Sequence, residues 1–424
     1  MDDTPRGTIA IADHLLTKRR TLATIGFLVI ILLDNVVNQA TMVGLANSLV
    51  SYGWLFLKIT DTTAYTLAGV FYNLGKLLLI IPLSRISDKI GRRKVLLFSF
   101  AFAVITLFII YFAQTVEIVY IGRLLFGMNS FVGVITALIS DYFPEESRGK
   151  PLGYMSGAML IGFLIGSLAG PAIFSSFGNK NSFLFLDGIA LTSFLIVLIL
   201  VKDHPNWSRK KQKKLTSSEK VIFKKLLRDP KFIGSMIINF FANMTFLGSG
   251  IYWNFIILNH FNITKNAGLW FLPPLAADFL TYIFVPILFR KKIKKVIFYA
   301  CLAGIPASII LFFKTDIILF TLAGVVFGVL NSAVIQANDT ISLEFIPKEI
   351  KGTAIGILKF FTIGAGTVGP LLFGILADIL GTFVPLTFFT IMLVIVGLTY
   401  WLLVYRNLKR FKGKNIEIDK GAII

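Results

Sequence analysis

The chain has 424 residues; 56% are hydrophobic, only 15% are charged, and the mean hydropathy is +0.79. Soluble domains carry about 25% charged residues, so this composition predicts a protein whose solvent is lipid. One cysteine excludes a disulfide framework, three histidines make a metal site unexpected, and the net charge of +20 lies in short runs between apolar stretches, so no nucleic-acid partner is expected.

Twelve apolar stretches are long enough to be membrane-spanning helices, which need roughly 20 residues each. They cover residues 22–45, 62–86, 95–114, 117–140, 151–174, 182–201, 232–258, 267–289, 295–313, 316–338, 353–377 and 382–404. The fold expected is an all-α integral membrane protein with twelve transmembrane helices in two six-helix bundles. The polar segment before the first helix lacks the apolar core of a signal peptide, so we expect that helix to be retained.

A long basic linker divides the predicted helices six against six. The N-terminal bundle occupies residues 1–201, the linker 202–231, the C-terminal bundle 232–404, and a tail 405–424. Apolar residues between Val221 and Leu227 alternate with lysines in an amphipathic pattern. Two interpretations are open: a short helix lying on anionic membrane lipid, or a solvated segment that only sets orientation.

The positive charges predict the orientation of the helices. If both termini lie on one side, that side holds 35 of the 42 Lys and Arg residues, and the opposite side holds four. Positive residues accumulate on the cytoplasmic side of membrane proteins. We therefore expect both termini to be cytoplasmic and the protein to lie in the plasma or inner membrane.

The two halves resemble each other. Phe126-Gly127 recurs as Phe327-Gly328, and Gly170-Pro171 recurs as Gly369-Pro370, with offsets close to half the chain. Because each half has an even number of predicted spans, both halves have the same orientation. This predicts a parallel repeat about a pseudo-two-fold axis along the membrane normal, as in transporters that rock two bundles around a central site.

Two charges lie near the middle of consecutive predicted helices. Asp34 and Lys76 are ~18 Å and ~15 Å from the cytoplasmic ends of their helices at 1.5 Å per residue. An ionisable side chain inside the membrane is by default functional, and it pairs with an opposite charge. We predict that Asp34 is a proton-coupling residue with Lys76 as its partner. A buried ion pair that only fixes helix packing is the alternative.

Other polar side chains within the predicted spans are candidates for substrate binding. Asp278 lies ~16 Å from the end of its helix, and Tyr282 follows one turn later. The remaining candidates are Asn35, Asn38, Asn243, Asn254, Asn331 and Gln336. Hydrogen bonding between helices is the alternative role for each of them.

The loop between the second and third predicted helices carries the most specific motif. Residues 84–94 read S-R-I-S-D-K-I-G-R-R-K, which resembles the G-x-L-x-D-R-x-G-R-R-K signature of the major facilitator superfamily. The resemblance implies a secondary transporter that works by alternating access. It further implies a gating role for Asp88, as a cap on the helix that begins near Gly352. Arg92 is expected to pair with Asp141, and a topology signal alone is the alternative.

Two further motifs resemble the same family. Arg123-Leu-Leu-Phe-Gly127 is similar to its R-x-x-x-G signature, in which the arginine is associated with proton coupling; a snorkelling anchor is the alternative. Gly157, Gly166, Gly170 and Pro171 follow the G-x8-G-x3-G-P pattern of its antiporter subgroup, without the two closing glycines. The last three are gating candidates, and close helix packing is the alternative.

The resemblance favours a proton-coupled exporter of amphiphilic or drug-like compounds, because residues 34–39 also resemble the acidic segment in the first helix of drug–proton antiporters. A symporter or facilitator for a nutrient or lysolipid-like solute is one alternative, and a non-transporting receptor or scaffold is another. No nucleotide-binding G-x-x-x-x-G-K-[ST] motif is present, so we do not expect ATP to drive transport directly. Nothing in the sequence indicates catalysis on covalent bonds, and we expect neither an enzyme nor a cofactor. The expected partners are a small-molecule substrate, protons and membrane lipids, and the chain is expected to be a monomer.

Overall fold

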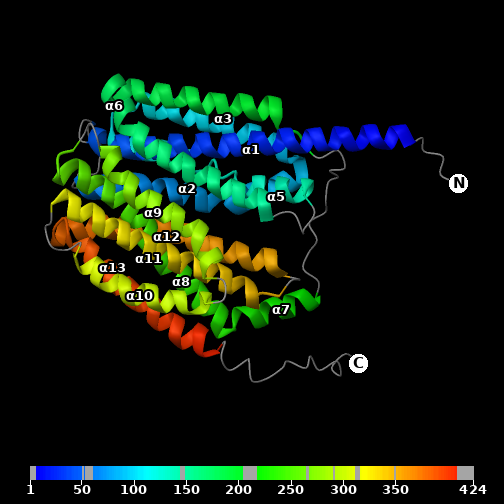
Figure 1. Cartoon of the computed structure of the whole chain (residues 1–424). Helices are drawn as coiled ribbons and strands as arrows, with labels where there is room; N and C mark the ends of the chain where they lie inside the picture. The colour runs from blue at the N-terminus through cyan, green and yellow to red at the C-terminus, as the bar shows by residue number, and fades with distance from the viewer. Residues whose placement is uncertain are drawn as a thin grey trace. The chain divides into compact units, whose positions relative to one another are not determined.

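The structure is a computed structural model. It describes residues 6–49, 52, 61–143, 149–203, 217–263, 267–289, 292–310, 316–347 and 350–407, and almost all of them are helical (Figure 1). Within these ranges, eight helices are long and apolar enough to cross a membrane, and a shorter apolar helix covers Leu269–Thr281. The chain is therefore an all-helical, multi-pass integral membrane protein.

The chain divides into two compact units. Unit 1 contains Met1–Lys214, Gly250–Ala276 and Gly366–Thr382; unit 2 contains Leu215–Ser249, Ala277–Ala365 and Phe383–Ile424. The helices that lie wholly or mostly in unit 1 are α1 (Arg6–Ser48), α2 (Asp61–Ile90), α3 (Arg92–Tyr111), α4 (Val116–Gly127), α5 (Val132–Tyr142) and α6 (Gly149–Leu200).

The π-helix η3 (Ile256–His260) also lies in unit 1. The remaining helices belong to unit 2 or are shared between the units. They are α7 (Ser217–Leu227), α8 (Pro230–Phe255), α9 (Ala267–Leu288), α10 (Ile293–Ile310), α11 (Ile317–Phe345), α12 (Lys351–Leu380), α13 (Val384–Thr399) and the π-helix η5 (Tyr400–Tyr405). Residues of α8, α9 and α12 contribute to both units.

Two stretches of unit 1 differ from the expected helices. The predicted span 117–140 is broken into α4 and α5 by a turn at residues 128–131, where Asn129 and Ser130 are buried polar residues in an otherwise apolar stretch. The predicted helices 151–174 and 182–201 both fall within α6, which changes direction at Gly178. Gly178 has φ 73°, a left-handed conformation that glycine adopts without steric cost.

Glycines allow α1 and α6 to pack with their backbones nearly in contact (Figure 1). A Cβ atom at Gly166 would lie 2.7 Å from the Val36 carbonyl oxygen, and one at Gly170 would lie 3.0 Å from the Cα of Ala40. A Cβ atom at Gly162, one turn before Gly166, would collide with the α1 backbone in the same way. Gly162 and the motif glycines Gly166 and Gly170 therefore form a stripe at i, i+4 and i+8 that holds α1 in place, whereas the motif glycine Gly157 has no atom within 4 Å of its Cβ position.

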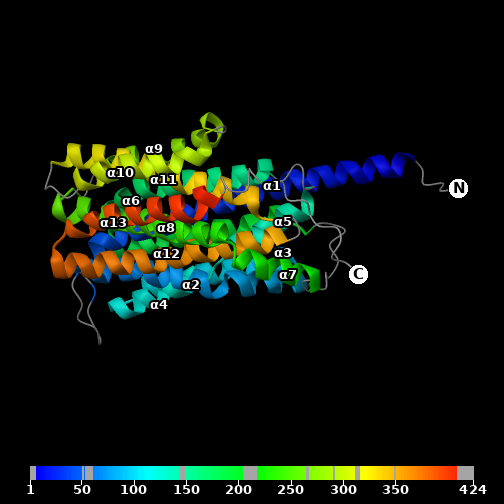
Figure 2. The same cartoon turned by 90° about the horizontal axis from the view of Figure 1, so that it is seen from below.

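A second close crossing joins α2 and α4, which lie side by side in Figure 2. A Cβ atom at Gly127 would collide with the Tyr72 carbonyl oxygen, and one at Gly75 would collide with the Leu124 carbonyl oxygen. The glycine of the R-x-x-x-G motif therefore lets the two backbones touch. Because Arg123 lies one turn from Gly127, this crossing brings its guanidinium to the side chains of α2.

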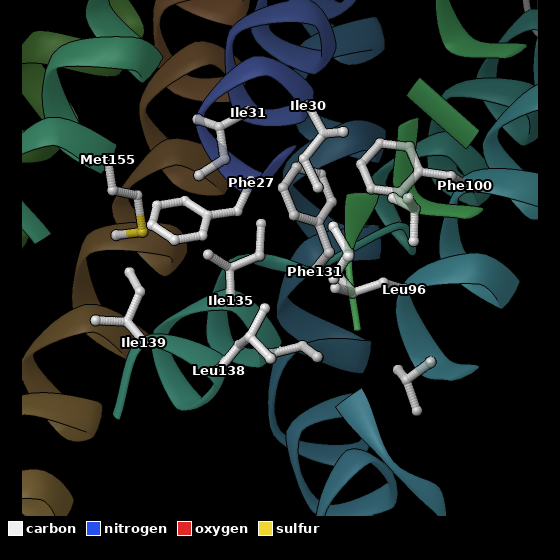
Figure 3. Packing of buried hydrophobic residues seen from close by; sticks show 14 of the residues in the cluster. Phe27, Ile30, Ile31, Leu96, Phe100, Phe131, Ile135, Leu138, Ile139 and Met155 are labelled. Carbon is white, nitrogen blue, oxygen red and sulfur yellow. The ribbon is translucent and has the colours of Figure 1, made fainter. Parts of the chain in front are cut away.

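An apolar cluster fills the space between α1, α3, α5 and α6 (Figure 3). Phe27 and Ile31 of α1 meet Ile135 of α5 and Met155 of α6, while Phe100 of α3 packs against Phe131 with ring centroids 4.8 Å apart. These side chains are buried in protein rather than facing lipid. The cluster fixes the half of α1 that precedes Asp34.

Within unit 1, the second half of α12 packs on the first half of α2. The amide and hydroxyl of Thr63 donate to the Asp378 carboxylate, and the Asn73 side-chain amide donates to the Gly366 carbonyl oxygen at 2.8 Å. A Cβ atom at Gly374 would collide with the Thr66 hydroxyl. These contacts join parts of the chain that are about 300 residues apart, at the end of α2 that is farthest from the basic loop.

The amphipathic part of the linker forms α7, and part of its apolar face is covered by protein. Leu226 is 5% exposed and clusters with Phe232, Ile346 and Leu358, and Ile222 packs against the same group. Val221 and Leu227, in contrast, are 56% and 38% exposed. A helix lying on lipid through these exposed residues stays a prediction.

We expect Gly166→Ala to destabilise the protein, because its new methyl group meets the α1 backbone, which has no room to yield. Overpacking of this kind typically costs about 1–3 kcal/mol. Gly157→Ala is the matched control in the same helix, since its Cβ position is open. Heat denaturation of the purified protein in detergent measures both. Equal melting midpoints for the two variants would contradict close packing at Gly166.

Candidate functional site

Polar side chains from α1, α2 and the α4–α5 segment meet in unit 1. We name the group the central cluster; its members are Asp34, Asn38, Tyr72, Lys76, Arg123 and Asn129. Asp34 and Asn38 are four residues apart on α1, as are Tyr72 and Lys76 on α2. This spacing puts each pair on one helix face. The close crossings at Gly166 and Gly127 determine which faces meet.

Arg123 is fully buried at the centre of this group. Its Nη2 donates to Asn38 Oδ1 at 3.0 Å, its Nε donates to the Ala68 carbonyl oxygen at 3.4 Å, and its Cζ lies 4.6 Å from the centroid of the Tyr72 ring. Its Nη1 has no hydrogen-bond partner among the described residues. A snorkelling side chain would reach the membrane surface, so this geometry argues against the anchor interpretation.

Asp34 is partly exposed and accepts a hydrogen bond from Asn129 Nδ2 at 3.3 Å. The two cations that act on it electrostatically are Lys76 and Arg123. No direct salt bridge between Asp34 and Lys76 is present in the described part of the chain, so the predicted pair is not in contact in this conformation. The Lys76 ammonium instead lies 4.3 Å from the centroid of the Tyr72 ring, one turn away on α2.

The basic loop forms a second charged group. Arg92 is 5% exposed; it forms an ion pair with Asp88, its Nε lies 3.2 Å from Asp141, and its Nη1 donates to the Ser87 hydroxyl at 2.6 Å. The predicted contact between Arg92 and Asp141 is confirmed. The predicted cap of Asp88 on the helix beginning near Gly352 stays a prediction, because that helix start lies in the other unit.

The structure also explains the glycine of the loop motif. Gly91 has φ +108°, and a Cβ atom there would lie 2.7 Å from Asp203 Oδ2. The Asp203 carboxylate accepts a hydrogen bond from the Arg93 backbone N–H at 2.9 Å, at the first turn of α3. A carboxylate is stabilised by the free amides and the dipole at a helix N-terminus. Gly91 therefore gives Asp203 access to this position.

The polar candidates of the second half lie mostly in unit 2, where those with described hydrogen bonds pair with other residues rather than with one another. Asp278 is 8% exposed and accepts from the Ser332 hydroxyl at 2.8 Å. The Asn331 side chain donates to the Ala242 carbonyl oxygen at 3.3 Å, and Asn243 donates to the backbone and side-chain oxygens of Asn239 at 2.7 Å. The Asp278 bond joins α9 to α11, the Asn331 bond joins α11 to α8, and the Asn243 bonds lie within α8.

A further group in unit 2 joins α8, α11 and α12. Lys359 Nζ lies 3.7 Å from Asp339 Oδ2, Asn239 donates to Asp339 Oδ1 at 3.4 Å, and the Thr362 hydroxyl donates to Asn239 Oδ1 at 2.6 Å. The Lys359 side chain is 54% exposed although it lies within a span. Such a charge is stable in a membrane only where it faces water or protein or reaches the membrane surface, and Asp339 supplies an acidic partner here.

Other candidates are not brought to these groups. Asn35 donates to the Ile31 carbonyl oxygen of its own helix at 2.8 Å and faces α6 at Gly162. Gln336 is partly buried in α11. Pro171 is buried within α6, next to the glycine stripe. Asn254 and Tyr282 lie in α8 and α9, but their side chains are outside the described residues.

Sequence reasoning missed Asn129, Asp339 and Asp203. Asn129 was detectable, because Asn-Ser in the middle of an apolar run is costly to bury without partners. Asp339 lay one residue beyond the predicted end of its helix and was therefore read as a loop residue. Asp203 follows the last apolar residue of α6, and only the folded chain shows that it reaches the start of α3.

We expect Arg123 and Asn38 to stabilise the protein as a unit. Arg123→Lys loses the planar donor geometry, and Asn38→Ala removes the acceptor, so each should lower the melting midpoint in detergent. The double variant should lose less than the sum of the two, because neighbours couple by about 0.5–3 kcal/mol. Arg123→Lys combined with Asn331→Ala, in the other unit, is the control and should be additive. Additive losses in both cycles would contradict the contact.

Comparison with known proteins extends over most of the chain. The family model for the Major Facilitator Superfamily matches residues 22–335 and 294–422. The class H tetracycline resistance protein of Pasteurella multocida is 30% identical over 139 residues, which are 32% of this chain and 34% of that protein. Multidrug resistance protein 1 of Bacillus subtilis is 27% identical over 164 residues, 38% of this chain and 41% of that protein. The chain thus spans less than half the length of these two relatives.

Solved structures share the fold over nearly the full length. A bacterial homologue of the human lysosomal transporter Spinster, in an inward-facing and unoccupied conformation, has a TM-score of 0.76 at 16% identity, covering 93% of this chain and 98% of that chain. The human organic anion transporter MFSD10 has a TM-score of 0.66 at 15% identity, covering 90% and 99%. With the family model matching more than half of the residues, this chain belongs to the major facilitator superfamily of transporters.

Proposed function

We propose that this protein is a proton-coupled secondary transporter that exports amphiphilic or drug-like compounds by alternating access. It would have twelve transmembrane helices in two six-helix bundles, with both termini in the cytoplasm. The observation that carries the proposal is the state of Asp34. This carboxylate lies in the middle of a span; among the described residues it accepts a hydrogen bond from one neutral amide and has two cations within electrostatic range but not bonded to it.

The contacts within the central cluster would allow Asp34 to change its binding partner. Lys76 is held by an aromatic face rather than by an acid, and Arg123 is held by Asn38 and a backbone carbonyl oxygen. Asp34 is therefore free to take a proton, a lysine ammonium or a cationic group of a substrate. Since a single carboxylate cannot hold two of these at once, proton and cationic substrate exclude each other, which is the condition for antiport.

The relatives support the substrate class. Two proteins with partial matches are named for resistance to tetracycline and to multiple drugs. Tyr72 also stacks on Phe126 with ring centroids 5.9 Å apart, so the cluster carries aromatic surface beside its charges. Aromatic and charged groups in one site suit amphiphilic cations. A symporter or facilitator for a nutrient or lysolipid-like solute would instead show substrate and proton moving together, or no proton movement.

We further propose that the charged loop group controls opening of the cytoplasmic side. Arg92 links Asp88 at the end of α2 to Asp141 at the end of α5. These contacts give the cytoplasmic end of unit 1 a rigid, charged edge on which a helix N-terminus of the second half can dock. At the opposite end of α2, Thr63 and Asn73 hold α12 through Asp378 and Gly366. Release of one contact set while the other forms would alternate access.

We expect Asp34→Asn to abolish proton-driven accumulation while leaving downhill exchange. The substitution removes the titrating group at nearly constant volume, and Asn129 can still hydrogen-bond to the amide oxygen. The measurement is uptake of ethidium or tetracycline into inside-out vesicles under an imposed pH gradient, with the internal pH followed in parallel. In inside-out vesicles, antiport should acidify the medium as substrate enters, and symport should acidify the lumen. If substrate entry acidifies neither compartment in the wild type, coupling to protons is excluded.

Asp187→Asn is the matched control for Asp34→Asn. Asp187 is another carboxylate within a span, in α6 and 5% exposed, and among the described residues no hydrogen bond or ion pair links it to the central cluster. Its variant should keep the wild-type pH response. Uphill transport that survives in Asp34→Asn would remove Asp34 as the coupling site and leave Asp278 as the next candidate.

We expect Asp88→Asn to abolish transport but to change equilibrium binding by no more than a few-fold. The loss of its charge weakens the Arg92 link and the docking of a helix terminus, whereas the central cluster is distant along α2. Transport is measured in vesicles, and binding is measured by the thermal stabilisation that the same compound gives the purified protein. Loss of binding together with transport, in a folded variant, would contradict a gating role.

A further inference from the structure

A cavity of about 240 Å³ lies on the surface of unit 2, between the start of α10 and the π-helix η5 that ends α13. Its lining combines two lysines, Lys294 and Lys295, with five aromatic rings. Neither the central cluster nor the groups around Asp278 and Asp339 take part in it. We propose that this cavity binds the head group of an anionic phospholipid.

The π-helix shapes the aromatic wall. In a π-helix the hydrogen bonds run from i to i+5, so residues five apart point to more similar sides of the helix than they do in an α-helix. Tyr400 and Tyr405 accordingly face the same cavity, with ring centroids 6.1 Å apart. The Tyr400 hydroxyl donates to the Lys294 carbonyl oxygen, which fixes α13 to the first turn of α10.

Of the two lysines that line the cavity, one is available to bind a ligand. Lys294 Nζ lies 2.6 Å from Glu344 Oε2, so its charge is neutralised by the protein. Lys295 is exposed, and no acidic partner for it is found among the described residues. The cavity therefore carries one uncompensated positive charge, the complement of a single phosphodiester. Basic pockets of this kind, between transmembrane helices at the cytoplasmic surface, suit anionic head groups.

The surroundings are those of the membrane interface. Tyr299 is 59% exposed and Trp401 is 49% exposed, and such rings concentrate where head groups meet acyl chains. Farther from the lysines, exposed apolar side chains continue on both helices, with Leu302 on α10 and Leu398 on α13. An acyl chain lying along these leucines would place its phosphate beside Lys295. A soluble phosphate ester would gain nothing from this apolar path.

The test is a titration of the purified full-length protein with short-chain phosphatidylglycerol, phosphatidylcholine and glycerol 3-phosphate, read as thermal stabilisation. We expect phosphatidylglycerol to stabilise the protein and the other two to have little effect. Lys295→Ala should weaken phosphatidylglycerol binding about fivefold, since one lysine near an anionic surface contributes about 1 kcal/mol. Lys292→Ala is the matched control, because Lys292 is exposed at the same helix end but does not line the cavity.

Three outcomes would overturn the proposal. Equal stabilisation by phosphatidylcholine would mean that the charge plays no part. Equal losses in the Lys295 and Lys292 variants would mean that lipid responds to the basic surface in general. Competition by glycerol 3-phosphate at the same concentration would assign the cavity to a soluble anion. Trp401→Leu gives an independent reading, because it should weaken phosphatidylglycerol binding while keeping every charge.

Discussion

The burial of one guanidinium governs the arrangement of the first unit. Arg123 is always charged and has no contact with solvent, so the protein itself must supply its solvation. It does so with an amide oxygen from α1, a carbonyl oxygen and a ring from α2. These partners fix three helices relative to one another. Any movement of one helix changes the environment of the charge, and so couples helix positions to electrostatics.

Close approach of backbones makes that solvation geometrically feasible. A guanidinium reaches a main-chain carbonyl of a neighbouring helix only if the two helix axes are near, and the glycines at positions 75 and 127 provide this proximity. The stripe on α6 does the same for α1. Small residues and a buried charge therefore act together. The glycines shorten the distance between the helix axes, and the guanidinium can then reach the carbonyl oxygen that solvates it. Motifs that look separate in the sequence describe one packing arrangement.

Much of this could be read from the sequence, because a membrane imposes strong rules on length and charge. Most of the apolar stretches fall in described helices, although one is broken into α4 and α5 and two lie together in α6, and Asp34, Lys76 and Arg123 were identified as intramembrane charges. Which side chains contact these charges could not be predicted from the sequence. Lys76 prefers the ring of Tyr72, and Asp34 meets Asn129, because helix rotation and the break between α4 and α5 decide which side chains touch. Likewise, the amphipathic pattern of α7 shows an apolar face but not what covers it.

The turn of α6 bears on how the chain enters the membrane. The most apolar 18-residue window of the span containing Gly178 has a mean hydropathy of 2.5, the highest such value among the eight spans of the described residues, and the polar segment Asn179-Lys180-Asn181-Ser182 interrupts the span at the bend. Two apolar arms joined by so short a polar tip can partition into the bilayer as a helical hairpin, since each arm satisfies its own backbone. The lysine at the tip would then cross the bilayer during biosynthesis, and Asp187 in the second arm would enter the bilayer with the hairpin.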